Sequence, residues 1–293
     1  MNRRQFINRS AVLLAASSMA TQELFAAAKP NKGRIGIQLY SIKDVLPNDF
    51  EGSLKKLSAM GYSSVELYSF NGDKFLEKTV KEVSVLLKDM GMKISGAHTG
   101  TNLLPADTNA PEWDFWKKCA TALKSGGANW AVQSYMPGPT KNMDDLKRIV
   151  DHFNRVGEVC KKNGVKFAFH NHHETFSKVD DEMLLDYLIK NTDPKLMFFQ
   201  LDLGHTVRGG GDCVHYVRDY PGRIPLWHAS DFDADTQKYT EVGKGSVPYP
   251  KLFELAKASG LADLTVEQET GGDIFAVLKA DFDYLKQFAW TKV

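Results

Sequence analysis

Histidines and carboxylates able to bind a metal ion close several short apolar segments of the chain. His170, Asp202, His228 and Glu267 each lie at or next to the end of such a segment. Two imidazoles and two carboxylates balance the charge of a divalent cation, and this mixed set suits Mn, Zn, Co or Fe better than Mg or Ca. The four side chains therefore predict one divalent metal ion. Asp202 taken alone has an alternative interpretation, a helix cap within residues 202–205.

The elements that position these residues alternate along the chain. The strand candidates are Arg34–Leu39, Ser63–Leu67, Lys93–His98, Asn129–Ser134, Lys166–His170, Phe198–Asp202, Pro225–Ala229 and Leu264–Glu267. Amphipathic stretches between them predict helices, among them Phe50–Met60, Leu76–Met90, Trp113–Ser125 and Met143–Asn163. Strict alternation predicts a parallel sheet, and eight such units in residues 31–293 match the size of a single (β/α)8 TIM barrel. A doubly wound sheet is the alternative, but its phosphate-binding glycine pattern is absent.

Side chains alternate along each strand between the barrel interior and the surrounding helices. This period predicts outward apolar residues, Val132 among them. It also predicts polar or ionisable inward residues near the end of every strand: Gln38, Tyr40, Glu66, His98, Gln133, His170, His172, Asp202, His228, Glu267 and Glu269. Active sites of such barrels form at the C-terminal ends of the strands. So many desolvated polar groups would be costly unless they enclosed a wet, functional cavity.

The beginning of the chain has the character of an export signal, so residues 1–30 are excluded from the fold. Arg3-Arg4-Gln5-Phe6-Ile7 is a twin-arginine signature, followed by a short apolar stretch and by a small-residue run that ends at Ala26-Ala27-Ala28. The apolar stretch is far shorter than the roughly 20 residues that span a bilayer. The protein is therefore predicted to be periplasmic or otherwise exported, with no membrane attachment after signal removal. An ordinary secretory signal with a chance arginine pair is the alternative.

Composition argues against several classes of protein. The 37 basic and 36 acidic residues give a net charge of +1, so nothing indicates a nucleic-acid surface. The hydrophobic content of 43% is enough for one large core or two modest ones. Cys119, Cys160 and Cys213 have neither a disulfide framework nor metal-type spacing, and we interpret them as small buried side chains.

Five motifs, taken in order, resemble the sugar phosphate isomerase/epimerase superfamily of xylose isomerase-like TIM barrels. That superfamily also contains inosose dehydratases and endonuclease-IV-type DNA repair enzymes. The resemblance runs from about Gly33 to the C-terminus. It rests on Phe169-His170-Asn171-His172, Leu201-Asp202-Leu203-Gly204-His205, Trp227-His228-Ala229-Ser230-Asp231, Val242-Gly243-Lys244-Gly245 and Val266-Glu267-Gln268-Glu269. The resemblance implies that Asp202, His228 and Glu267 bind the metal, and that His205 and Asp231 line the substrate pocket.

The chain departs from the superfamily at one catalytic position. Sugar epimerases of this kind use two glutamates, on the fifth and eighth strands, which bind the metal and move a proton on opposite faces of the substrate. Glu267 matches the second glutamate, but His170 stands at the first, and a metal-bound imidazole has no free lone pair for proton transfer. Glu174 is then a candidate second base, with Glu269 as an alternative, unless the two-base mechanism does not apply. A solvated loop carboxylate is the other interpretation of Glu174.

The resemblance implies proton abstraction next to a carbonyl, with the metal polarising the carbonyl and stabilising an enediolate. Glu267 or Glu174 is the expected base, and His98, His172 or His205 is expected to supply a proton to an oxygen. The residues expected to bind substrate are Gln38, Glu66, His98, His172 and Asp231.

Two reactions diverge from the enediolate. Reprotonation gives a sugar isomerase or epimerase, which is the first expectation. Expulsion of a β group gives a lyase or dehydratase acting on a keto-sugar or a 3-keto-glycoside. A non-catalytic sugar-binding barrel is a third class, but it would not need Glu267 beside a metal. The expected ligand is a small sugar or sugar derivative, and export disfavours a phosphorylated one. Superfamily members are often dimers or tetramers, so a homo-oligomer stays open.

Overall fold

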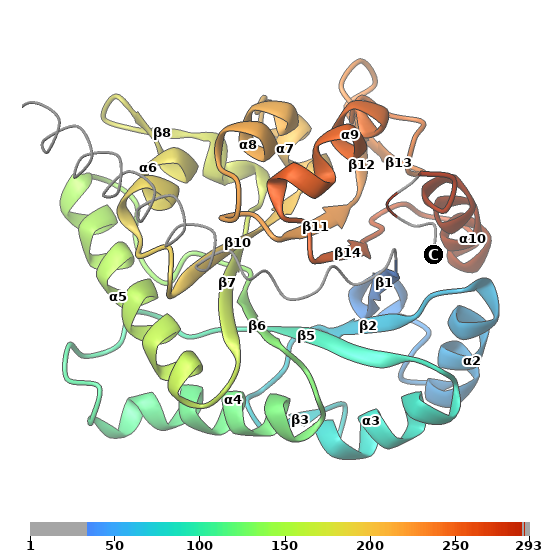
Figure 1. Ribbon diagram of the computed structural model, residues 1–293, viewed down its shortest axis with the longest axis horizontal. Helices are drawn as coiled ribbons and strands as arrows, with labels where there is room; N and C mark the ends of the chain where they lie inside the picture. Colours follow the sequence, from blue (N-terminus) through green and yellow to red (C-terminus); the bar gives the residue numbers. More distant parts are fainter. Residues whose placement is uncertain (1–33, 289, 291–293) are drawn as a thin grey trace, which may run out of the picture.

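Eight parallel strands close into a barrel, with helices around its outside (Figure 1). The computed structural model describes residues 34–288 and residue 290, so the predicted export signal lies outside the described residues. In order around the barrel the strands are β1 (Ile35–Gln38), β2 (Ser64–Leu67), β5 (Lys93–Thr99), β6 (Trp130–Gln133), β7 (Lys166–His170), β10 (Met197–Asp202), β11 (Leu226–Ala229) and β14 (Asp263–Val266). β14 pairs with β1 and closes the ring. The structure confirms the TIM barrel prediction, and each barrel strand overlaps its predicted range.

The helices that cover the barrel are α2 (Phe50–Met60), α3 (Val80–Asp89), α4 (Asp114–Ser125), α5 (Met143–Lys162), α6 (Leu184–Asn191), α7 (Leu203–Arg208), α8 (Cys213–Asp219), α9 (Tyr249–Ser259) and α10 (Ile274–Leu285). Their apolar faces pack on the outward strand residues and form the main core. Gly61 ends α2 with a φ of 111°, a left-handed conformation that glycine adopts without strain.

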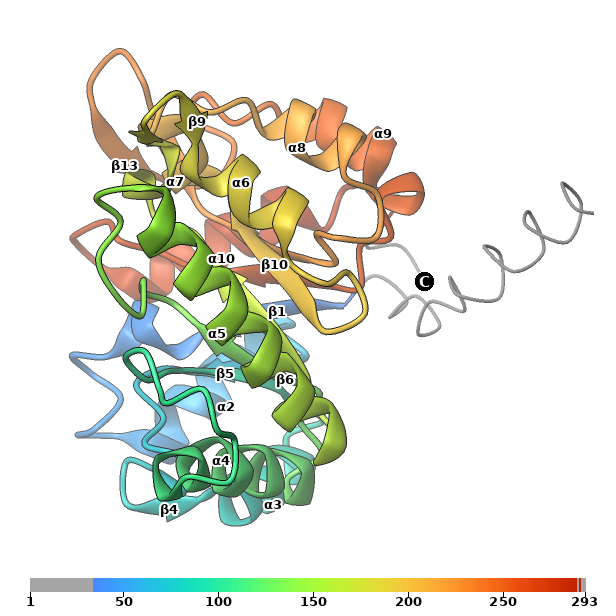
Figure 2. The same ribbon diagram turned by 90° about the vertical axis from the view of Figure 1, so that its left-hand side faces the viewer.

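Three short antiparallel hairpins follow barrel strands and therefore lie on the C-terminal side of the barrel (Figure 2). They are β3 (Lys74–Phe75) with β4 (Lys78–Thr79), β8 (Lys178–Val179) with β9 (Glu182–Met183), and β12 (Asp231–Asp233) with β13 (Lys238–Thr240). Since active sites of this fold form on that side, the hairpins belong to the loops that surround the cavity described below.

The helix predicted over Leu76–Met90 begins only at Val80, because the first hairpin occupies the residues before it. Thr79 caps the helix: its hydroxyl accepts the backbone N–H of Glu82, and the Glu82 carboxylate accepts the backbone N–H of Thr79. Such a capping box satisfies backbone donors that a longer helix would have used. The hairpin and the Thr79 cap therefore decide where this helix begins, although the apolar pattern of the sequence extends to earlier residues.

In β6 the inward and outward positions are the reverse of those predicted. Val132 was expected to face outward, yet it packs with Trp130, Ala168 and Leu226 in a small apolar cluster separate from the main core. Ala168 and Leu226 lie two residues before His170 and His228 on the same strand faces, so this cluster fills the barrel interior beneath the site. Gln133 accordingly turns away and donates its amide to the carbonyls of Thr101 and Tyr135.

The helical layer also contains the three cysteines. Cys119 on α4, Cys160 on α5 and Cys213 on α8 are buried and form no disulfide, as interpreted from their spacing. Within the described part of the chain, no helix has both the length and the apolar character needed to cross a membrane.

His152 on α5 is a buried histidine outside the cavity. Its side chain packs beside Trp113, its Nδ1 accepts the backbone N–H of Leu104 at 3.4 Å, and its Nε2 has no hydrogen-bond partner among the described residues. Burial lowers the pKa of His152 to about 4, although nearby Asp151 acts in the opposite direction. The folded protein therefore holds this imidazole neutral at pH values where the unfolded chain already protonates it.

Acidification is expected to destabilise the protein partly through His152. Because the folded pKa is below the unfolded value, this contribution to stability is complete above about pH 6.5 and is lost as the pH falls towards 4. Between pH 7 and pH 5 the loss amounts to about 2 kcal/mol of unfolding free energy. Urea unfolding at several pH values tests this, with His152→Phe as the variant that keeps the ring packing. An equally steep pH dependence in both proteins would contradict it.

Candidate active site and metal centre

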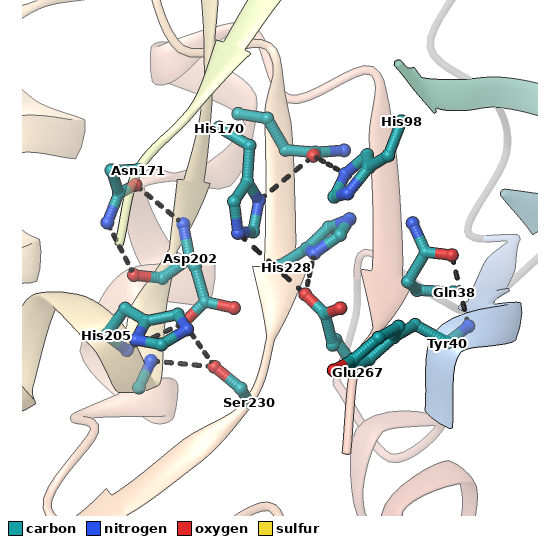
Figure 3. Close-up of polar contacts among 12 residues, drawn as sticks. Gln38, Tyr40, His98, His170, Asn171, Asp202, His205, His228, Ser230 and Glu267 are labelled. Atoms are coloured by element: carbon teal, nitrogen blue, oxygen red, sulfur yellow. Dashed lines mark hydrogen bonds and ion pairs between the residues drawn. The ribbon is translucent and has the colours of Figure 1, made fainter. Parts of the chain in front are cut away.

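Four potential metal ligands converge at the C-terminal end of the barrel. His170 ends β7, Asp202 ends β10, His228 lies on β11 and Glu267 directly follows β14. Their ligand atoms all lie within 4.8 Å of one another, and the four side chains are buried. Figure 3 shows His170, His228 and Glu267 pointing toward one another, with Asp202 beside them. The structure thus brings together the residues that the sequence predicted as a metal site.

Two buried atoms of this cluster lack a hydrogen-bond partner. His170 Nε2 and Asp202 Oδ2 have no hydrogen-bond partner among the described residues. The other oxygen of Asp202 accepts the Ser230 hydroxyl at 2.5 Å and the backbone N–H of His205 at 2.7 Å, so the carboxylate is held in one orientation. A buried polar atom without a partner costs free energy. A divalent cation among these lone pairs would satisfy both atoms, so the residues present fit such an ion.

The cluster carries strong electrostatic coupling. Burial opposes the charge of His228, but Glu66 and Glu267 on its two ring nitrogens outweigh it and raise its pKa to about 10. Burial also raises the pKa of Asp202, against the neighbouring positive charge of His205. A ring held between two carboxylates is protonated on both nitrogens in the absence of a metal, so a cation would replace one proton at this cluster.

A cavity of about 290 Å³ opens next to the cluster. Its lining has two halves, which come from opposite parts of the chain. Side chains on β5 or after β1, β2 and β6 supply aromatic rings, hydroxyls and one imidazole: Tyr40, Tyr68, Ser69, His98 and Ser134. Segments after β7, β10 and β14 supply ionisable groups: His172, His205, Glu267 and Glu269. Of the four clustered residues, Glu267 is the one that also lines this cavity.

His205 is held between two partners at the cavity wall. Its Nε2 lies 3.1 Å from Glu269 Oε1, and its Nδ1 lies 2.6 Å from the Tyr239 hydroxyl. Because a carboxylate only accepts, Nε2 carries the proton of this pair. Burial disfavours the charged ring, yet Asp202 and Glu269 outweigh it and raise the pKa of His205. By contrast, burial lowers the pKa of His172 to about 4, so that neighbour is neutral at physiological pH.

Three residues predicted to bind substrate lie away from the cavity surface. Glu66 and Gln38 are buried deeper in the barrel, where the Gln38 amide donates to the Glu66 carboxylate at 3.0 Å. Asp231 accepts the backbone N–H groups of Phe232, Gly243, Gly245 and Val247 and so braces the loop after β11. None of the three is among the residues that line the cavity, whereas His98 and His172 are.

Glu174 lies outside the cavity, contrary to its predicted role as a second base. Its side chain is 70% exposed and pairs with His173 on a short 3-10 helix, His173–Phe176. Glu174 is not among the residues that line the cavity, although its charge still acts on the neighbouring His172. Glu269 instead brings a second carboxylate to the cavity wall.

Three contributors to the site were not predicted from the sequence. Gln200 lies on β10 two residues before Asp202, so the period of two would have found it, and its amide contacts both His98 and His170. Ser230 was part of a quoted motif, but nothing in its residue type indicated the bond to Asp202. Tyr239 comes from the β12–β13 hairpin, where no strand period applies.

Substitution of the two loop glutamates should separate their roles. Glu174→Gln is expected to change kcat/KM by less than about 2-fold, since surface charges away from a site have small effects. Glu269→Gln should lower kcat by about 10²-fold, because it removes a negative charge that keeps His205 protonated. Steady-state kinetics of both variants measure this, and a larger loss for Glu174→Gln would restore the sequence-based assignment.

Comparison with known proteins agrees with this geometry. The crystal structure of a sugar phosphate isomerase/epimerase from Parabacteroides distasonis superposes with a TM-score of 0.78 and 28% identity, over 91% of this chain and 98% of that chain. An inosose dehydratase from Clostridium beijerinckii is 24% identical over 241 residues, which are 71% of this chain and 78% of the relative. The apo structure of a 3-keto-D-glucoside 4-epimerase from E. coli shares the fold, with a TM-score of 0.65, 17% identity and coverage of 87% and 100%.

A family model that matches most of the chain identifies the family to which the protein belongs. The family model for the xylose isomerase-like TIM barrel matches residues 54–291, which is well over half of the chain. The resemblance inferred from five motifs is thereby confirmed, and the protein belongs to the xylose isomerase-like TIM barrel family.

Proposed function

We propose that this protein is a metal-dependent lyase that eliminates a group β to the carbonyl of a keto-sugar or a 3-keto-glycoside. The distribution of bases around the cavity carries this proposal. Glu267 and Glu269 both follow β14, while His170 occupies the place on β7 where the resemblance puts a second metal-binding glutamate. Elimination needs one base for one carbon-bound proton, whereas two-base epimerisation needs a second base on the other face of the substrate.

Each side chain has a task in such an elimination. The bound cation would supply Lewis-acid stabilisation of negative charge on the carbonyl oxygen. Glu267 takes the proton from the carbon next to the carbonyl, and the C–H electron pair becomes the new C=C bond. The C–O bond to the leaving group breaks, and the leaving oxygen takes the proton from His205 Nε2. Glu269, 3.1 Å from that nitrogen, accepts this hydrogen bond before the transfer, and its negative charge keeps the imidazole protonated until the leaving oxygen takes the proton.

The lining of the cavity supports an uncharged substrate. Among the residues that line it, two are glutamates and none is a lysine or arginine. The lining therefore lacks the lysine and arginine side chains that commonly bind a phosphate group. The hydroxyls of Ser69 and Ser134 and the rings of Tyr40 and Tyr68 are groups that suit sugar hydroxyls and ring faces. The similarity to a dehydratase and to a 3-keto-D-glucoside epimerase supports the same class of ligand.

Isomerisation or epimerisation is the second candidate. It is favoured by Glu269, which is a second carboxylate on the cavity wall, and by the similarity to the Parabacteroides distasonis isomerase/epimerase. In that reaction Glu267 and Glu269 would act on different carbons or faces, and the product would keep every bond of the substrate skeleton.

One experiment separates the two reactions. The full chain, loaded with Mn²⁺ or Zn²⁺, is incubated in D2O with methyl 3-keto-glucosides and with free ketoses, and the products are followed by NMR. Release of methanol with formation of an unsaturated keto-sugar is expected. Deuterium in an intact ketose or glycoside, without release of methanol, would overturn elimination and support the second candidate.

We also propose that the protein works outside the cytoplasm, on the basis of the twin-arginine signature in residues 1–30. Replacing Arg3 and Arg4 together by lysine is expected to retain the protein in the cytoplasm, because twin-arginine export depends on this pair. Cell fractionation measures the distribution, and unchanged export of the double variant would favour an ordinary secretory signal.

A further inference from the structure

The Glu66 carboxylate lies at the centre of a hydrogen-bond network inside the barrel. Its Oε2 is 2.6 Å from His228 Nε2, 3.0 Å from the amide of Gln38 and 3.3 Å from His98 Nε2. Its Oε1 is 2.9 Å from the amide nitrogen of Gln200. Glu66 is 2% exposed, and these contacts tie it to β1, β5, β10 and β11. The carboxylate therefore serves residues around it rather than the cavity.

The identity of the donors in this network is fixed by chemistry. An ionised carboxylate has no proton to give, so each of its partners donates. His228 Nε2 therefore carries a hydrogen toward Glu66. The other ring nitrogen, Nδ1, lies 2.8 Å from Glu267 Oε2, on the side of the ligand cluster. Of the two nitrogens, Nδ1 is the one in position to offer its lone pair to a cation.

Gln200 links Glu66 to His170 and thereby determines which nitrogen of that imidazole carries a hydrogen. Its amide nitrogen donates to Glu66, so its Oε1 is an acceptor. That oxygen lies 3.1 Å from His170 Nδ1 and 2.8 Å from His98 Nε2, and both nitrogens must therefore carry hydrogens. His170 is left with a lone pair on Nε2, a buried atom that has no hydrogen-bond partner among the described residues and lies 3.9 Å from Glu267 Oε2.

We propose that Glu66 is a positioning residue that fixes the tautomers of both imidazole ligands, directly for His228 and through Gln200 for His170. In the metal-bound protein His228 ligates through Nδ1 and His170 through Nε2. This inference rests on the metal site of the proposed function. It gives Glu66 a task that differs from the substrate contact expected from the sequence, because the carboxylate never reaches the cavity. Outer carboxylates of this kind orient histidine ligands and raise their basicity.

The wild-type protein alone tests the assignment. With ¹⁵N-labelled histidine and one equivalent of Zn²⁺, two-bond ¹H–¹⁵N correlation spectra distinguish a ring protonated on Nε2 from a ring protonated on Nδ1. We expect His228 to keep its proton on Nε2 and His170 on Nδ1. The reverse tautomer at either ring would overturn the proposal. Failure of Zn²⁺ to bind at all would instead contradict the metal site, and with it the proposed function.

Glu66→Gln provides a second, quantitative test. The new amide must direct its NH2 group either toward His228 or toward Gln200. In the first case His228 Nε2 becomes an acceptor and its Nδ1 is blocked by a proton. In the second case Gln200 must turn over, and its NH2 group then forces the proton of His170 onto Nε2. In either orientation one imidazole carries a proton on its ligating nitrogen, so the Kd for Zn²⁺ is expected to rise by about 10- to 100-fold.

A matched control separates this effect from a general loss of stability. Asp281 on α10 is also a buried, hydrogen-bonded carboxylate, which accepts the backbone N–H of Val242 and the amide of Gln268. Asp281→Asn should leave the Kd for Zn²⁺ unchanged within about 2-fold. Chelator competition measures each Kd, and circular dichroism confirms folding. Equal affinities of wild type and folded Glu66→Gln, or equal losses in both variants, would overturn the positioning role.

Discussion

Glu267→Gln is expected to lower kcat by at least about 10³-fold with the protein still folded. Glu267 belongs both to the ligand cluster and to the cavity lining, so it can meet the substrate carbon and the cation together. An amide cannot accept a proton from carbon, and removal of a general base costs about 10²- to 10⁴-fold. The lost negative charge next to His228 weakens the metal site as well. Both effects act in the same direction.

Metal saturation separates these two effects. Turnover of a methyl 3-keto-glucoside is measured at rising Zn²⁺ or Mn²⁺ concentration, with bound metal determined by elemental analysis. A variant that carries a full equivalent of metal and still lacks turnover identifies Glu267 as the base. Recovery of wild-type kcat at saturating metal would restrict Glu267 to ligation, and the proton would then have to leave through another group such as Glu269.

The barrel itself was predictable because its signals are local and repeated. Each strand is an apolar run followed by an amphipathic helix, and every unit repeats the pattern, so an error in one unit leaves the fold unchanged. The β6 strand is the instructive exception. Trp130 and Val132 are as apolar as outward residues, and only the need to fill the barrel interior explains why they face inward. Packing inside the barrel, and not the alternation along the strand, therefore determines that these two side chains face inward.

The sequence predicted the ligand cluster. It did not predict how far along the barrel axis a neighbouring inward residue such as Glu66 lies from the cavity. His170, Asp202, His228 and Glu267 come from adjacent strands, and parallel strand ends must converge. Glu66 has the same inward period, but strands of a barrel are tilted and staggered, so equal places in sequence lie at different depths along the axis. The loop after β7 has no strand period, so the sequence could not decide whether Glu174 is a second base or a solvated loop carboxylate, and its exposure supports the second interpretation.

Asp202→Asn is expected to weaken metal binding by more than about 100-fold, which is beyond the effect of a changed outer partner. Oδ1 of this carboxylate accepts two hydrogen bonds, from the Ser230 hydroxyl and from the backbone N–H of His205. These donors would hold the oxygen of the new amide at the same place. Its NH2 group would then occupy the position of Oδ2, the buried atom without a partner, and direct hydrogens where a cation needs a lone pair.

Ligand-linked stability measures this loss without any assumption about substrate. An ion that binds only the folded protein stabilises it by about 4 kcal/mol at a concentration of 1,000 times Kd. Wild type should therefore melt at a clearly higher temperature with Zn²⁺ than with a chelator. Asp202→Asn should lose most of this shift, because a site with 100-fold lower affinity contributes at most about 1.4 kcal/mol at the same Zn²⁺ concentration. Glu269→Gln is the matched control, since it lines the cavity outside the ligand cluster and should keep the full shift. A normal Zn²⁺ shift in Asp202→Asn would mean that the cation sits elsewhere, and the assignment of all four ligands would fail together.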